Sequence, residues 1–291
     1  MKAYPHLHPD TIRILELDRQ ACSDHMRAQR FVPYPAGMAA LRWLRHLYQT
    51  EYERDRPRSM HLLGAAGMGK SRVLKHYASL HGQEERDAQG HRARPVVLVE
   101  MRHGDYKTLC TDLIGACLPD FRPTRAGSYL DRVIPSLQAA GVRQILIDEA
   151  GHLLLGGKHS QQQCLALLKS ITNQGITICI ATTENMKAVL AADEQLSSRF
   201  MQVRLPHWSE SQEFRQFLSG IEAQIPLPEP SRLDRVQIVR WLVSHGYTIT
   251  SALLDLIRDA ATTAILSGHP HLTFELLQET AAMVTPPDRT A

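Results

Sequence analysis

Gly64-Ala65-Ala66-Gly67-Met68-Gly69-Lys70-Ser71 is the stretch that decides the fold of this 291-residue chain. It matches in full the pattern G-x-x-x-x-G-K-[ST] of a phosphate-binding loop. In such a loop the glycines let successive backbone N–H groups point at phosphate oxygens. Lys70 is expected to reach the β- and γ-phosphates of a nucleotide, and Ser71 is expected to bind Mg²⁺. An apolar run precedes the loop and a helical pattern follows it, which is the context that the motif requires. The stretch from Gly64 to Arg72 therefore predicts a binding site for ATP and Mg²⁺.

An acidic pair follows a second apolar run, in Ile145-Leu146-Ile147-Asp148-Glu149-Ala150. The carboxyl end of a buried strand would place Asp148 beside the phosphate-binding loop, as a partner of Mg²⁺ through water. Glu149 would then polarise the water that attacks the γ-phosphate. Together with a complete phosphate-binding loop, this pair predicts an ATPase.

Two further positions are candidates for the hydrolysis step. The apolar run 176–181 ends in Thr182-Thr183-Glu184-Asn185, where a polar side chain would orient the γ-phosphate or the water. Thr183 is the first choice and Thr182 or Asn185 the alternative, and a plain turn is also compatible with these residues. Arg199 precedes the last predicted strand and is placed to act on the ATP of a neighbouring subunit. The alternative for Arg199 is that it only caps the C-terminus of the preceding helix.

The pattern of apolar residues predicts an α/β fold, a three-layer core around a five-stranded parallel sheet. Continuous apolar runs suit strands that are buried on both faces. These runs lie at residues 60–63, 95–101, 144–147, 176–181 and 201–205. Helices are predicted between them at 70–81, 105–117, 127–140 and 160–173.

The chain is predicted to have four parts. Residues 1–57 form an N-terminal helical segment with helices at about 10–29 and 36–52, and residues 58–207 form the nucleotide-binding core. Residues 208–284 form a small helical domain that opens with a capping box at Ser209 and continues with helices near 231–244, 249–266 and 272–284. Residues 285–291 are expected to be a disordered tail.

The composition is that of an ordinary globular protein, with 43% hydrophobic and 22% charged residues. No membrane association is expected, because no run approaches the ~18 apolar residues of a membrane span, and the N-terminus lacks the apolar core of a secretory signal. The five cysteines are odd in number and scattered, which favours reduced thiols and a cytoplasmic location. The fifteen histidines show no metal-ligand spacing, so no metal besides Mg²⁺ is expected. Residues 1–147 carry an excess of Lys and Arg, which is compatible with a nucleic-acid face or with a solvated surface.

Over roughly residues 30–284 the chain resembles the AAA+ ATPases that regulate DNA transposition, the TniB/TnsC type. The resemblance rests on local features that occur in the right order. They are Phe31-Val32-Pro33-Tyr34-Pro35, Pro95-Val96-Val97-Leu98-Val99, the stretch from Gly141 to Leu154 with its acidic pair, Asp193-Glu194-Gln195-Leu196 before Ser198-Arg199-Phe200, and Trp208-Ser209. The phosphate-binding loop and the acidic pair are shared by all AAA+ proteins, whereas the Phe31–Pro35 segment and the total length are specific to this type.

The resemblance implies a protein that oligomerises as a ring or filament on double-stranded DNA when ATP is bound. It would mark target DNA for a DDE transposase of the TniA/TnsB type, recruit a TniQ-type adaptor, and disassemble after slow, regulatory ATP hydrolysis. On DNA it would be associated with the bacterial nucleoid. Basic and hydroxyl side chains near the second strand and the following helix contact the DNA backbone in this family. The corresponding candidates are Arg102, Lys107, Arg122, Thr124 and Arg125, and solvation of the surface is the alternative for all five.

One stretch departs from the AAA+ pattern. AAA+ lids often carry an arginine at the start of the third lid helix, but residues 246–253 lack a basic residue and the next one is Arg258. Coupling between lid and nucleotide is therefore expected to be weak or differently built. Two other functions are compatible with the sequence: another AAA+ DNA ATPase of the helicase or initiator-loader type, and an ATP-binding signalling or scaffold module without a DNA role.

Overall fold

The computed structural model describes residues 4–28, 30–86, 92–118, 130–186 and 194–283. The chain divides into two compact units. One unit is Ala36–Pro206, and the other combines Met1–Pro35 with His207–Ala291. The segment 1–57, which the sequence predicts as one part, is therefore divided between the two units. The predicted tail, residues 285–291, lies outside the described residues.

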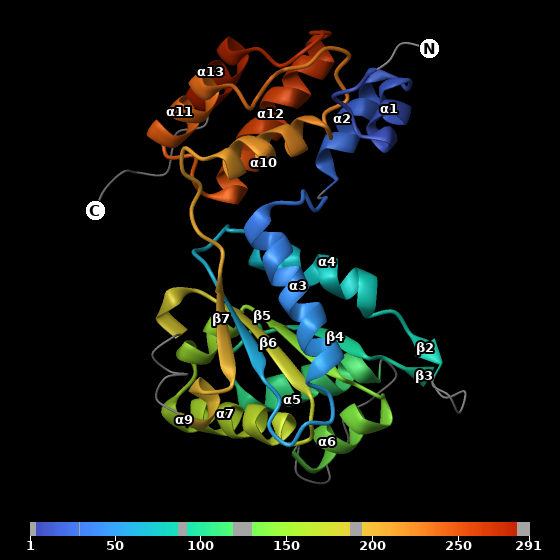
Figure 1. The fold of residues 1–291 in the computed structure, drawn as a ribbon, viewed down its shortest axis with the longest axis vertical. Helices are drawn as coiled ribbons and strands as arrows, with labels where there is room; N and C mark the ends of the chain where they lie inside the picture. Colours follow the sequence, from blue (N-terminus) through green and yellow to red (C-terminus); the bar gives the residue numbers. More distant parts are fainter. Residues whose placement is uncertain (1–3, 29, 87–91, 119–129, 187–193, 284–291) are drawn as a thin grey trace. The chain divides into compact units, whose positions relative to one another are not determined.

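A parallel five-stranded sheet forms the centre of the unit Ala36–Pro206 (Figure 1). Its strand order is β4-β5-β6-β1-β7, and all neighbouring pairs are parallel. The strands are β1 (Ser59–Leu63), β4 (Val96–Glu100), β5 (Gln144–Asp148), β6 (Thr177–Thr182) and β7 (Phe200–Arg204). The predicted fold class and its five strands are confirmed. A short hairpin of β2 (Glu85–Arg86) and β3 (Arg92–Ala93) was not predicted, because two-residue polar strands carry no apolar periodicity.

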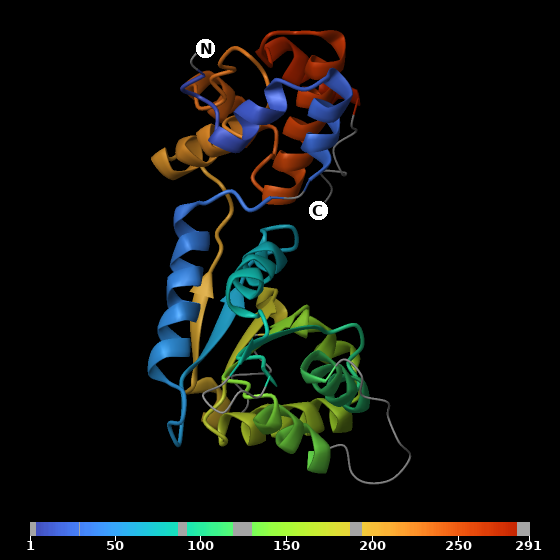
Figure 2. The same ribbon diagram turned by 90° about the vertical axis from the view of Figure 1, so that its right-hand side faces the viewer.

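Helices cover both faces of this sheet (Figure 2). On one face α5 (Tyr106–Cys117), α6 (Leu130–Ala139) and α7 (Lys158–Thr172) share an apolar core with alternate residues of the strands, such as Ile145 and Ile178. On the other face lies α4 (Lys70–His81), beside α3 (Pro35–Thr50). Tyr48 of α3 stacks on His81 of α4. The predicted layers are therefore present, with the phosphate-binding loop between β1 and α4.

In the second unit, Met1–Pro35 with His207–Ala291, the regular elements of the described residues are helices. They are α1 (Pro9–Leu15), α2 (Arg19–Arg27), α10 (Gln212–Glu222), α11 (Val236–Ser244), α12 (Thr250–Ser267) and α13 (Phe274–Met283). An aromatic cluster joins the two parts of the chain within this unit. Trp208 stacks on Phe217 at 4.4 Å between ring centroids, and Tyr34 meets both rings edge-on at 5.4 Å. Such packing explains why residues before position 36 belong with the C-terminal helices.

Two local boundaries differ from the sequence-based expectation. The predicted helix 10–29 is broken, because the Asp18 carboxylate accepts a hydrogen bond from Ala21 N at 2.7 Å and caps a new helix, α2. The helix after Trp208 starts later than the predicted capping box: Ser211 is its N-cap, and its Oγ accepts from Phe214 N at 3.2 Å. Among the described residues, no helix is long and apolar enough to cross a membrane.

Candidate nucleotide site

The predicted phosphate-binding loop joins the carboxyl end of β1 to the first residue of α4. Gly67 (φ 75°) and Gly69 (φ 90°) adopt left-handed backbone conformations, which side chains with a Cβ rarely tolerate. Gly64 is constrained by space: a Cβ there would lie 3.1 Å from Leu205 O. The N-cap position of α4 is Gly69, and no side chain caps this helix end. The N-terminal N–H groups of α4 and the loop backbone could therefore bind an anion.

Lys70 is folded back over the loop. Its Nζ donates to Gly64 O at 2.8 Å and to Ala65 O at 2.9 Å, and the residue is only 7% exposed. Burial lowers the pKa of Lys70, while the carboxylates of Glu149 and Asp148 act in the opposite direction. These carboxylates are close enough to influence the ammonium group, so the loop and the acidic pair form one site.

The acidic pair lies at the same edge of the sheet as the loop. Asp148 is the last residue of β5 and is buried, and one of its oxygens, Oδ1, accepts from Glu149 N at 3.0 Å. Glu149 is exposed and has a left-handed backbone (φ 52°), a conformation that costs a residue other than glycine about 1 kcal/mol. The hydroxyl of Ser71 and the carboxylate of Asp148 are the hard oxygen donors that Mg²⁺ prefers, so these residues could hold it.

The end of β6 carries the polar candidates for orienting water or phosphate. Thr182 is buried, and its Oγ1 donates to Thr183 O at 2.8 Å. The same oxygen lies 2.6 Å from Nε2 of His61, a buried residue of β1 that sequence reasoning missed. Because these contacts engage the Thr182 hydroxyl, the half-buried Thr183 and the exposed Asn185 are the better candidates.

Arg199 lies at the opposite, amino edge of the sheet. Its carbonyl accepts from Ser59 N at 2.8 Å, immediately before β7 and β1 pair. Its guanidinium Nη1 donates to Thr172 Oγ1 at 2.7 Å and to Asn173 Oδ1 at 3.0 Å. The length of β7, five residues at ~3.3 Å each, separates Arg199 from the carboxyl edge. The side chain is thus at the C-terminal end of α7, and it is too far away to reach the phosphate-binding loop of its own chain.

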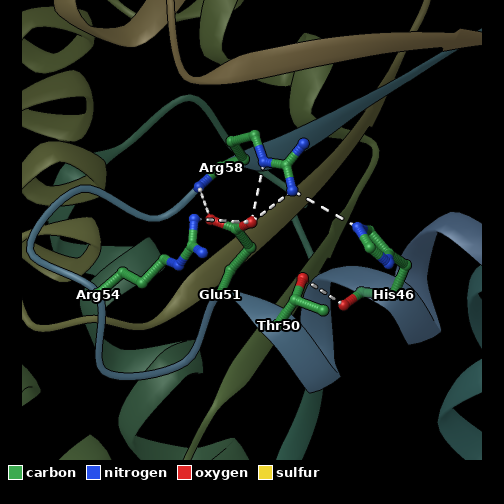
Figure 3. Close-up of polar contacts among 5 residues, drawn as sticks. All are labelled: His46, Thr50, Glu51, Arg54 and Arg58. Carbon is green, nitrogen blue, oxygen red and sulfur yellow. Dashed lines mark hydrogen bonds and ion pairs between the residues drawn. The ribbon is translucent and has the colours of Figure 1, made fainter.

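A buried carboxylate organises the same amino edge (Figure 3). Glu51 is only 1% exposed, and its Oε1 accepts from Arg58 Nε at 2.9 Å and Nη2 at 2.6 Å. Its Oε2 accepts from Arg58 N at 3.1 Å, and Arg54 Nη1 lies 3.6 Å from Oε1. Nη2 of Arg58 also lies 3.4 Å from Nε2 of His46. The sequence shows only a charged run here, so nothing in it distinguishes the buried acid from its exposed neighbours.

We expect Glu51→Gln to destabilise the protein at neutral pH by about 1–3 kcal/mol, since a half-exposed Arg58 would lose its buried partner. Burial by itself raises the pKa of Glu51, but hydrogen bonds and charge from Arg58, with Arg54, bring that pKa below its usual 4.5. A carboxyl with a depressed pKa stabilises the fold above pH 4.5, and this contribution is lost as the pH falls through the folded pKa.

Urea unfolding at several pH values measures this effect. The difference between wild type and Glu51→Gln should shrink below pH 4.5. Glu210→Gln, which removes the exposed partner of Arg240, should cost under ~1 kcal/mol. An equal effect of the two substitutions at pH 7 would contradict the assigned role of Glu51.

The DNA-contact candidates are only partly described. Arg102 and Lys107 are exposed, on the segment between β4 and α5 and in the first turn of α5. Arg102 is close enough to Asp112 to oppose the rise that burial causes in the pKa of that carboxyl. Arg122, Thr124 and Arg125 lie outside the described residues. In the other unit Arg258 pairs with Asp255 on its own helix, α12, at 2.7 Å.

One family model and several solved structures are similar to this chain. The family model described as Bacterial TniB protein matches residues 23–210, more than half of the chain. Among solved structures, Aeropyrum pernix ORC1 in complex with DNA has 18% identity and a TM-score of 0.60 over 92% of this chain and 69% of that one. Aeropyrum pernix ORC2 with ADPNP and ADP has 14% identity and a TM-score of 0.63, with 93% and 73% covered.

Domain III of the Thermotoga maritima replication initiation protein DnaA has 14% identity and a TM-score of 0.57, with 97% of this chain and 99% of that one covered. None of the curated proteins matches this chain significantly. At such identities the structural likeness establishes the fold, while the family model covers both the phosphate-binding loop and the acidic pair. The chain belongs to the bacterial TniB protein family and is a P-loop ATPase with the AAA+ fold.

Proposed function

We propose that this ATPase regulates DNA transposition by assembling on duplex DNA with ATP, recruiting a DDE transposase and a TniQ-type adaptor, and disassembling after hydrolysis. The observation that carries the assembly part is the position of Arg199. It lies at the sheet edge opposite the phosphate-binding loop, with its guanidinium on the C-terminal end of α7. An arginine in this position can act only on the nucleotide of another copy, so turnover would depend on assembly.

Within one copy the residues divide the work of hydrolysis. The backbone of residues 64–69 and the start of α4, through Ser71 and Arg72, hold the phosphates, and Lys70 exchanges its loop carbonyls for the β- and γ-phosphates. Ser71 and Asp148 hold Mg²⁺, which when bound offsets phosphate charge. Glu149 takes up the proton of the attacking water, and Thr183 orients that water or the γ-phosphate.

The DNA part rests on the family and on charge. The TniB family supports a role on transposon target DNA, and two structural neighbours, ORC1 of Aeropyrum pernix and Drosophila ORC, are solved in complexes with DNA. Exposed Arg102 and Lys107, with Arg122, Thr124 and Arg125, are the proposed contacts to the DNA backbone. The four basic side chains would neutralise phosphates, the Thr124 hydroxyl would donate a hydrogen bond to one, and such backbone contacts carry no sequence preference. In the bacterial cytoplasm the assembly would then be associated with the nucleoid.

A second candidate function is that of another AAA+ DNA ATPase, such as an initiator loader. The structural likeness to ORC1 and to DnaA favours this alternative. The two functions differ in how DNA is recognised and in their partners. Sequence-selective binding without a response to a transposase would support the initiator type.

Binding of fluorescent duplexes of unrelated sequence tests the proposal. With a non-hydrolysable ATP analogue, affinity should be the same for all sequences and should fall steeply with salt, with a log–log slope of about −0.9 per neutralised phosphate. With ADP the affinity should be much weaker. Absence of binding at low salt would contradict every DNA function and favour a signalling or scaffold role.

Arg199→Ala should lower the ATPase rate of the assembled protein by about 10³-fold or more, the range known for arginines donated between subunits. The affinity of the monomer for ATP should be unchanged, because the side chain does not reach its own nucleotide site. Phosphate release in the presence of DNA and nucleotide titration at low protein concentration measure the two quantities. An unchanged rate in the assembled state would exclude a role of Arg199 in hydrolysis and would leave it a structural role at the C-terminal end of α7.

A further inference from the structure

Arg199 is fixed by two segments that lie far away in the sequence. Its backbone carbonyl accepts from Ser59 N at 2.8 Å, at the end of the loop 51–58. Its guanidinium is bound by Thr172 and Asn173, in the turn that ends α7. The position of Arg199 therefore depends on how this loop and this turn are held.

The loop and the turn are joined to one another. Glu53 N donates to Gly175 O at 3.3 Å. Gly175 has φ 76°, and a Cβ at this position would lie 2.9 Å from Glu53 Cα and 3.0 Å from Glu53 N. The backbones thus meet without room for a side chain, and a shift of the loop would displace the turn that binds the guanidinium.

Glu51 determines the shape of the loop. Its carboxylate accepts hydrogen bonds from the guanidinium and from the backbone N–H of Arg58, the residue directly before Ser59. A buried ion pair contributes little net stability compared with apolar residues of similar size, but it fixes geometry because its donors must converge on two oxygens. The loop 51–58 holds as many arginines as acids, so its formal net charge is zero. The effect of the loop on Arg199 therefore depends on the geometry of the loop and not on its net charge.

We propose that Glu51 is a positioning residue for Arg199. It acts through the loop 51–58 and the turn 172–175, and it holds the Arg199 side chain in the position that acts on the ATP of a second copy. This inference rests on the proposed role of Arg199 between subunits. An error of ~1 Å in the position of a catalytic group can cost ~10²-fold in rate. Loss of the Glu51 charge should therefore lower turnover on the neighbouring copy and leave nucleotide binding by its own copy intact.

A mixing experiment with two inactive variants separates these roles. Glu149→Gln would bind ATP without turnover and still offer Arg199, so it serves as the donor copy. Arg199→Ala keeps its own Glu149 and serves as the acceptor copy. Mixed on DNA with ATP, the two should regain turnover at acceptor sites that adjoin a donor.

Glu51→Gln is then added to one copy at a time. On the donor it should reduce the regained turnover by roughly 10- to 100-fold, whereas on the acceptor it should change little. Glu210→Gln on the donor, which breaks an exposed pair in the other unit, should have no effect. Equal losses on donor and acceptor would indicate a purely structural role and overturn the inference.

Asn173→Ala provides a test that does not depend on the stability of the Glu51 variant. Asn173 is exposed, so its truncation removes a contact of Arg199 without exposing the core. It should show the same preference for the donor copy. Full turnover with both donor variants would overturn the inference while leaving the trans role of Arg199 intact. Failure of the unmodified mixture to regain any turnover would overturn both.

Discussion

Lys70→Ala is expected to abolish nucleotide-dependent assembly and to weaken ATP binding by about 100-fold or more. Lys70 is only 7% exposed, and its ammonium group donates two hydrogen bonds to the loop carbonyls of Gly64 and Ala65, so its removal leaves both the loop and the phosphates without their cation. Truncating one partner of a buried, charged hydrogen bond costs about 2–5 kcal/mol. Titration with a fluorescent ATP analogue and light scattering in the presence of DNA measure the two effects.

Lys75→Ala is the matched control for this prediction. Lys75 lies on the same helix, α4, but it is half exposed. Its Nζ forms a long surface ion pair with Glu100 Oε2, at 3.9 Å. Its loss should leave ATP affinity and assembly near wild type, because surface pairs contribute under ~1 kcal/mol. Unchanged ATP affinity of Lys70→Ala would show that the glycine-rich loop is not the nucleotide site.

Glu149→Gln is expected to stop turnover while ATP binding and assembly persist. The amide has the size of the carboxylate and can keep the left-handed turn at φ 52°, but it cannot accept the proton of the attacking water. General-base catalysis contributes about 10²- to 10⁴-fold, so phosphate release should fall by that factor. Complexes with DNA should live correspondingly longer, since hydrolysis is the proposed trigger for disassembly.

Glu100→Gln tests whether this effect is specific. Glu100 is the register partner of Asp148 at the end of the adjacent strand, and its carboxylate is half exposed. The substitution removes the same charge from the same sheet edge without touching the proposed base. If the Glu149→Gln variant turned over ATP as fast as the Glu100→Gln variant, Glu149 would not be the general base.

The elements that sequence reasoning predicted well are those with a local signal. Strands such as β5 and β6 are buried along their whole length, so each appears as a continuous apolar run between turns. The phosphate-binding loop needs particular residue types at fixed spacing. The left-handed conformation of Gly69 and the lack of space for a Cβ at Gly64 explain the two glycines that the pattern requires. Fold class and ATPase activity followed from these signals, whereas the family was implied by the resemblance that the Phe31–Pro35 segment and the total length carry.

The features that sequence reasoning missed depend on contacts between distant residues. Residues 1–35 pack with the C-terminal helices through pairs such as Tyr34 and Trp208, which no local pattern can reveal. Glu51 lies in a charged run that is typical of a solvated surface, and only the fold places it beside Arg58 and out of water. His61 likewise lies within the apolar run 60–63, and only the fold brings its ring into contact with the Thr182 hydroxyl.

The two sheet edges carry different parts of the proposed reaction. The carboxyl edge carries Lys70, Asp148 and Glu149, whereas the amino edge carries Arg199 and the loop that Glu51 organises. A single copy would therefore hold ATP but hydrolyse it slowly. Assembly on DNA would bring the two edges of neighbouring copies together, and the same contact would later limit the lifetime of the assembly.

Electron microscopy of the protein with duplex DNA and a non-hydrolysable ATP analogue tests this account most directly. We expect rings or filaments on the DNA with the analogue, and dispersed protein when ADP replaces it. Arg199→Ala should still assemble with the analogue, because the arginine is needed for turnover. Isolated monomers on DNA, or assemblies that form equally well with ADP, would contradict the central claim that ATP governs assembly on DNA.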